Sequence, residues 1–127
     1  MVNMLNELGF GRTLRRPAIE ATATPQERRI IDYHRNSMRS GNVGKDAEGR
    51  PVTVYSTGIL VREGPLKGKY VSVPGFVNGK IVDNDDDLYR IWKDEIDAGK
   101  WPAYDDPKTL NFRSQTIHQI MDMESPW

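Results

Sequence analysis

Residues 52–82, with the sequence VTVYSTGILVREGPLKGKYVSVPGFVNGKIV, decide the fold because β-branched and aromatic residues are interspersed there with turn signals. Three or four short strands are marked by the apolar residues Val52, Val54, Ile59, Val61, Tyr70, Val71, Val73, Phe76, Val77, Ile81 and Val82. Turns are expected at Gly64-Pro65, Pro74-Gly75 and Asn78-Gly79, and Asn-Gly is the strongest hairpin signal because both residues tolerate a positive φ. The connections are too short for a parallel crossover, so the stretch predicts an antiparallel β-meander.

A helix is predicted before the strands. Thr24-Pro25-Gln26-Glu27 forms a capping box, with a threonine cap, a proline at the first helical position and a glutamate that can bond back to the cap. The helix should run from Pro25 to about Ser40 and stop at Gly41. Its exposed side is basic and carries Arg28, Arg29, Arg35 and Arg39.

Two further helices are predicted after the strands. Apolar residues repeat at helical spacing from Asp85 to about Ala98, and Gly99 ends this segment. The last helix should span Leu110 to Glu124. Its expected apolar face consists of Phe112, Ile117, Ile120 and Met121. The fold class is therefore α+β, with a small antiparallel meander of three to four strands and about three helices packed against one face of it.

The chain is expected to divide into three parts. Residues 1–23 read as an extended N-terminal arm, because glycines and Pro17 oppose a helix there. Residues 24–124 form a single α+β domain, and residues 125–127 form a short tail. The arm carries three arginines, Arg12, Arg15 and Arg16.

Composition narrows the classes of function. The 127 residues include no cysteine, which excludes disulfides, zinc–thiolate sites, iron–sulfur clusters and thiol nucleophiles. The sequence shows no secretory signal pattern, and no apolar run approaches the ~20 residues that cross a bilayer. We therefore expect a protein of the cell interior that has no membrane partner.

Charge is balanced overall but unevenly placed. Residues 1–50 carry nine Lys/Arg against six Asp/Glu, and residues 51–127 carry nine against twelve. This asymmetry could support head-to-tail contacts between copies, or a basic arm on an acidic body; the alternative is two ordinary solvated faces. A dedicated nucleic-acid binder would be far more basic.

No motif in the sequence predicts catalysis, a metal site or a cofactor. The acidic run at residues 83–87 has Leu88 where a calcium-binding EF-hand loop needs glycine, so we interpret it as the capped start of a helix. His34 and His118 lie on separate helices, and Asp122, four residues after His118, suggests a hydrogen bond on the helix surface. Residues 41–45 contain glycines and a lysine but lack the strand–loop–helix context of a phosphate-binding loop. The expectation is a protein that is not an enzyme.

The residues predicted to bind partners are arginines and aromatic side chains. Arginine is favoured at protein interfaces, where it pairs with carboxylates in a bidentate manner, and it also contacts phosphates. Large aromatic residues in loops and at a terminus either pack onto their own domain or bind a neighbour. The candidates are Arg12, Arg15, Arg16, Arg28, Arg29, Arg35, Arg39, Trp101, Tyr104 and Trp127.

Three stretches of the chain resemble small proteins encoded by tailed bacteriophages: residues 8–12 (LGFGR), 49–57 (GRPVTVYST) and 117–122 (IHQIMD). The resemblance implies a virion-associated or assembly protein present in several copies, located in the virion or in the host cytoplasm. It transfers no catalytic residue.

Two functions remain open from the sequence. The first is a non-enzymatic structural subunit that contacts neighbouring subunits through the N-terminal arm. The alternative is a small regulatory protein that binds a host protein or nucleic acid through the basic helix at residues 25–40. The first predicts other protein subunits as partners, and the second would add nucleic acid.

Overall fold

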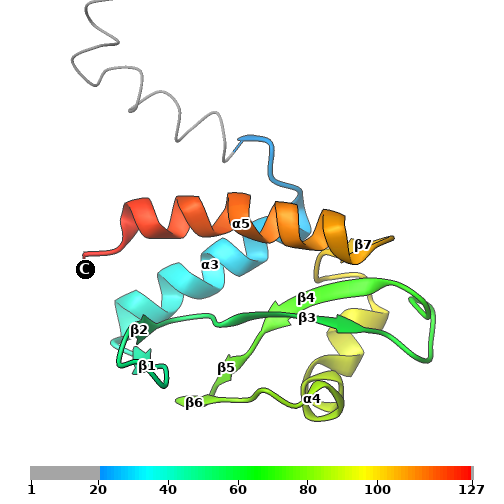
Figure 1. The fold of residues 1–127 in the computed structure, drawn as a ribbon, viewed down its shortest axis with the longest axis horizontal. Coiled ribbons are helices and arrows are strands. Elements are labelled where there is room, and N and C mark those ends of the chain that lie inside the picture. Colours follow the sequence, from blue (N-terminus) through cyan, green and yellow to red (C-terminus); the bar gives the residue numbers. More distant parts are fainter. Residues whose placement is uncertain (1–20, 127) are drawn as a thin grey trace, which may run out of the picture.

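A computed structural model describes residues 21–126, which fold as the α+β protein that the sequence predicts (Figure 1). Its helices are α3 (Pro25–Ser40), α4 (Asp85–Asp97) and α5 (Pro107–Glu124). Its strands are β1 (Gly44–Lys45), β2 (Pro51–Val52), β3 (Ser56–Leu60), β4 (Tyr70–Pro74), β5 (Phe76–Val77), β6 (Lys80–Ile81) and β7 (Ala103–Tyr104). The predicted N-terminal arm lies outside the described residues except for its last three positions, and Trp127 of the predicted tail also lies outside them.

The first helix begins and ends where its local sequence predicts. The Thr24 hydroxyl accepts a hydrogen bond from the backbone N–H of Glu27, and the Glu27 carboxylate accepts one from the backbone N–H of Thr24. At the other end, Gly41 adopts a left-handed conformation with φ of 73°, and its N–H bonds back to the last turn. The capping box and the glycine stop therefore fix both ends of α3.

The strands form three small antiparallel sheets within the described residues. The hairpin predicted at Asn78-Gly79 is confirmed, because both residues have positive φ and Phe76 pairs with Ile81 across the turn. The largest sheet has the order β3–β4–β7, with Ile59 opposite Val71. Its third strand, β7, returns after α4 and lies between the last two predicted helices, where the sequence analysis placed no strand. A two-residue strand shows no alternation of its own, so sequence reasoning missed it.

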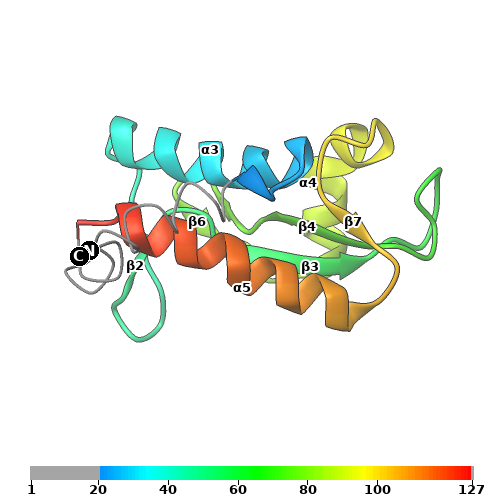
Figure 2. The same ribbon diagram turned by 90° about the horizontal axis from the view of Figure 1, so that it is seen from above.

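Helices cover both faces of this sheet, not one face as expected. α5 lies above the β3–β4 pair and α4 lies below it in Figure 1, and both helices contact β3 and β4. Side chains of β4 are buried on both faces, with Val71 and Val73 on one and Ser72 on the other. Seen from above, α3 and α5 lie side by side (Figure 2). The core between these elements includes Ile30, Leu88 and Ile117.

The last helix begins earlier than predicted and turns a different face to the core. Asp106 caps it by accepting a hydrogen bond from the N–H of Thr109 at 2.7 Å, and Pro107 occupies its first turn. Its buried side chains are Leu110, Ile117, Ile120 and Met121. Phe112 was assigned to this apolar face, and that assignment was wrong. A spacing of five residues between Phe112 and Ile117 turns them about 140° apart on a helix with 3.6 residues per turn.

Candidate functional site

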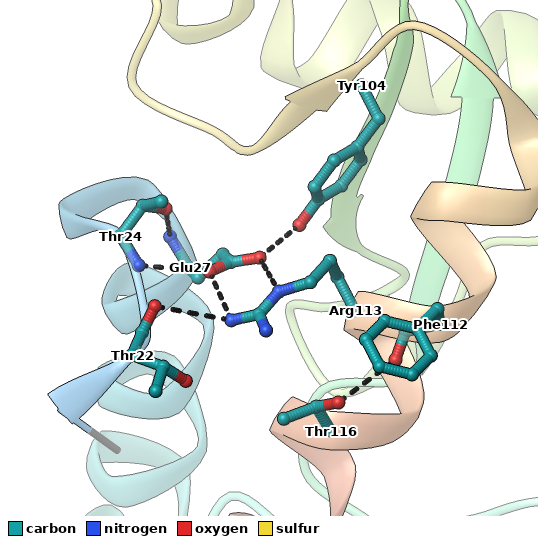
Figure 3. Close-up of polar contacts among 7 residues, drawn as sticks. All are labelled: Thr22, Thr24, Glu27, Tyr104, Phe112, Arg113 and Thr116. Atoms are coloured by element: carbon teal, nitrogen blue, oxygen red, sulfur yellow. Dashed lines mark hydrogen bonds and ion pairs between the residues drawn. The ribbon is translucent and has the colours of Figure 1, made fainter. Parts of the chain in front are cut away.

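A buried polar network joins the start of α3 to β7 and α5 (Figure 3). Its centre is Glu27, which is only 1% exposed. One carboxylate oxygen accepts hydrogen bonds from the Tyr104 hydroxyl at 2.6 Å and from Arg113 Nε at 2.9 Å. The other accepts from an Arg113 terminal nitrogen at 2.9 Å and from the backbone of Thr24 at 2.9 Å. Four donors thus occupy the carboxylate, which leaves little acceptor capacity for a ligand.

The network keeps Glu27 ionised. Burial alone would raise its pKa, but the hydrogen bonds from Arg113, Tyr104 and Thr24 outweigh burial and lower the pKa to about 2 from an ordinary 4.5. Burial, and then the neighbouring Glu27 carboxylate, raise the pKa of Tyr104. At neutral pH the centre is therefore an ion pair with a neutral phenol, which is a structural arrangement.

Two of the four arginines predicted to bind partners on α3 are engaged within the protein. Arg29 pairs with Glu95 of α4, and its guanidinium lies over the ring of Trp101, 4.6 Å from the ring centre. Arg35 makes a bidentate contact with Glu124 of α5, with a shortest distance of 2.6 Å. Arg28 and Arg39 remain on the exposed side of the helix. The basic face is therefore smaller than the sequence suggests.

The predicted aromatic contacts also point inward. Trp101 is 3% exposed, and its ring meets Trp92 edge-on at 5.2 Å. Tyr104 is part of the Glu27 network. Both rings pack against their own domain, which is one of the two outcomes expected for such aromatic residues, and their role in binding a partner stays a prediction. The remaining predicted residues, Arg12, Arg15, Arg16 and Trp127, lie outside the described residues.

A pocket of about 440 Å³ opens between α3, the segment after β1 and the C-terminal half of α5. His34 lines it and is 2% exposed. Its Nδ1 is hydrogen-bonded to the hydroxyl of Thr53 at 2.6 Å, whereas Nε2 is buried and has no partner among residues 21–126. Burial lowers the pKa of His34, so the ring favours its neutral form.

The rim of this pocket carries two unusual features. His118 Nε2 lies 3.4 Å from Asp122 Oδ1, which confirms the surface contact suggested by their spacing. Tyr55 adopts a left-handed backbone with φ of 53°, an uncommon conformation for a bulky residue. Within residues 21–126, no three His, Cys, Asp or Glu side chains gather so as to hold a metal ion. The neutral imidazole of His34 thus lies in the wall of the pocket.

The outward face of α5 is the feature that sequence reasoning missed. Phe112 is 64% exposed and Met123 is 43% exposed. Between them the same face carries three uncharged residues, and the charged Lys108 lies one turn before Phe112. We call the following five residues the outer stripe of α5: Phe112, Gln115, Thr116, Gln119 and Met123. Figure 3 shows Phe112 and Thr116 next to each other on this helix, where the Thr116 hydroxyl donates to the carbonyl of Phe112. Counting seven positions back from Ile117 would have identified Leu110 as the buried residue and placed Phe112 outside.

Comparison of the chain with protein-family models, curated proteins and solved structures found no match. Among the described helices, none combines the length and the apolar character needed to span a bilayer.

Proposed function

We propose that this protein is a non-enzymatic structural or assembly subunit, present in several copies, and that it is a virion component of the kind encoded by tailed bacteriophages. The observation that carries the proposal is the outer stripe of α5. Burying a phenylalanine side chain contributes about 1.5–3 kcal/mol, so a ring left 64% exposed is stabilised when a neighbour covers it. The absence of charge along the stripe favours a protein neighbour over a phosphate backbone.

The polar groups of α3 support this choice over the regulatory alternative. Arg29 and Arg35 are held by Glu95 and Glu124, so a partner of the basic helix would meet chiefly Arg28 and Arg39. Two exposed arginines provide a small electrostatic footprint for nucleic acid. The arm arginines Arg12, Arg15 and Arg16 remain part of the proposal as further contacts with neighbouring subunits.

Affinity capture of the tagged full-length protein from its native setting, followed by mass spectrometry with stoichiometry, tests the function. A large complex of fixed composition with several copies of the chain is the expected result. Recovery with nucleic acid, with one other protein, or alone would contradict the assembly role.

Two matched variants of α5 test whether the outer stripe is a contact surface of the complex. Phe112→Asp places a charge on the outer stripe and should reduce recovery of the complex at least several-fold. Asn111→Asp places the same charge on the same helix, about 100° away from Phe112, and should leave recovery unchanged. Equal recovery for both variants would remove the stripe as a contact surface.

A further inference from the structure

Four of the five residues in the outer stripe of α5 are placed symmetrically along the helix. Phe112 and Met123 are eleven residues apart, which is three turns and about 16.5 Å at 1.5 Å per residue, so both project from the same face. Thr116 and Gln119 lie between them at equal distances from the midpoint. These four residues therefore read the same in either direction, as large apolar, neutral polar, neutral polar and large apolar. Gln115, the fifth residue of the stripe, has no counterpart, because the symmetric position is the buried Ile120.

We infer that a second copy of this chain covers the outer stripe, with the two α5 helices antiparallel about a two-fold axis near residues 117–118. This inference rests on the proposed multi-copy function and specifies one of its contacts. Phe112 of each copy then packs against Met123 of the other, which is a favourable sulfur–aromatic contact. Thr116 of each copy faces Gln119 of the other, where hydroxyl and amide can form hydrogen bonds.

Charge and symmetry favour a second copy over other occupants. A two-fold contact uses the same patch twice, so the patch must complement itself, and an uncharged stripe does so without repulsion. In this register Lys108 of one copy approaches the C-terminal end of the other α5, where the helix dipole is negative. A highly charged partner would find no counter-charge on the stripe.

The size of the stripe sets the expected strength. One helix face of 18 residues is smaller than the ~800 Å² per partner that a stable protein interface buries, so the pair should be weak in dilute solution. Other contacts between subunits, as in the proposed assembly, would reinforce it. A covalent trap is therefore a better test than an equilibrium measurement.

Because the chain has no cysteine, single introduced cysteines report the register directly. Full-length Phe112→Cys and Met123→Cys proteins would be mixed in equal amounts and oxidised mildly. We expect a mixed disulfide between them. Each variant alone should cross-link at most weakly, because identical residues lie about 16.5 Å apart along the axis in this register, beyond the ~7 Å Cα separation that a disulfide spans.

The control replaces Phe112→Cys with Asn111→Cys, one residue away but off the stripe, and this mixture should give far less mixed disulfide. Both stripe residues are exposed, so thermal unfolding of each variant should match that of the parent protein and show that folding is intact.

Every other outcome overturns the inference. Strong cross-linking of Phe112→Cys with itself would indicate parallel helices. Failure of all mixtures to cross-link would remove the second copy as the occupant. If affinity capture still recovers a multi-copy complex in that case, the proposed function stands and only this contact fails; if capture recovers the protein alone, both fail.

Discussion

Glu27 and His34 lie on the same side of α3, two turns apart, and both are buried, yet their surroundings differ sharply. Glu27 receives four hydrogen bonds from α3 itself, β7 and α5. His34 makes a hydrogen bond to Thr53 through one nitrogen, and the other nitrogen has no partner among the described residues. A buried polar group without a partner costs about 1–3 kcal/mol of stability. The fold therefore carries this cost at His34 and not at Glu27.

The buried polar groups at Glu27 and His34 therefore have different roles in the fold. At Glu27 the partners saturate the carboxylate and lock three elements together. At His34 one buried nitrogen has no partner among the described residues, in a side chain that lines a pocket. The following four predictions test this contrast, from the largest expected effect to the smallest.

Removal of the Glu27 carboxylate should have the largest effect. Glu27→Ala leaves the Arg113 guanidinium, which is mostly buried, without its counter-charge and removes one of the two hydrogen bonds of the capping box, so the free energy of unfolding should fall by about 3 kcal/mol. Urea denaturation measures this loss. A double variant, Glu27→Gln with Arg113→Met, keeps an acceptor for Tyr104 and should lose clearly less. A loss below about 1 kcal/mol for Glu27→Ala would show that the network adds little stability.

Acid should weaken the same network in a defined pH window. The pKa of Glu27 is about 2 in the folded protein against an ordinary 4.5, so the unfolded chain takes up the proton first. This contribution to stability is complete above about pH 4.5 and is lost as the pH falls towards 2. Urea denaturation across this range should show a steeper fall for the parent protein than for Glu27→Gln. Parallel profiles would mean that the carboxylate is not specifically stabilised.

Thr53→Val should have an intermediate effect. It removes the hydroxyl hydrogen-bonded to His34 Nδ1 and leaves both ring nitrogens unsatisfied, which should lower the free energy of unfolding by about 1–2 kcal/mol. The substitution keeps the shape of the side chain, so packing is little changed. Thr109→Val is the comparison for the loss of an exposed hydrogen bond, because the Thr109 hydroxyl donates to Asp106 at 3.0 Å. If Thr53→Val and Thr109→Val lower the free energy of unfolding equally, the hydrogen bond between Thr53 and His34 contributes little stability.

Titration of His34 should give the smallest effect. Burial lowers its folded pKa below the ordinary 6.5, so the unfolded chain binds the proton more readily, and stability should begin to fall as the pH drops below about 6.5. His34→Gln should flatten this part of the profile, which chemical denaturation between pH 7 and 5 measures. His118→Gln is the comparison variant; because the charge of His118 also lowers the pKa of His34, it should flatten the profile less than His34→Gln does.

Local sequence patterns correctly predicted the helix ends and the turn that depend on residues close together in the chain. Both ends of α3, the Asn78-Gly79 hairpin and the start of α4 at Asp85 follow from residues within a few positions of each other. The polar network around Glu27 could not be predicted from local patterns. Arg113 and Tyr104 lie 86 and 77 positions from Glu27, and only the folded chain brings them together. From the sequence, Glu27 was predicted only as the glutamate of the capping box, with no sign of its charge partner.

The pairing of Glu27 with Arg113 also bears on when the protein can fold during synthesis. The ribosome makes Glu27 early, but its counter-charge lies in α5, 86 residues later. Until α5 has been made, α3 cannot satisfy its buried carboxylate, and the faces of the strands that α5 covers stay in water. Folding of the described domain is thus delayed until late in translation, and contacts of such long sequence separation form slowly. A nascent chain arrested before α5 would expose this surface to chaperones and proteases.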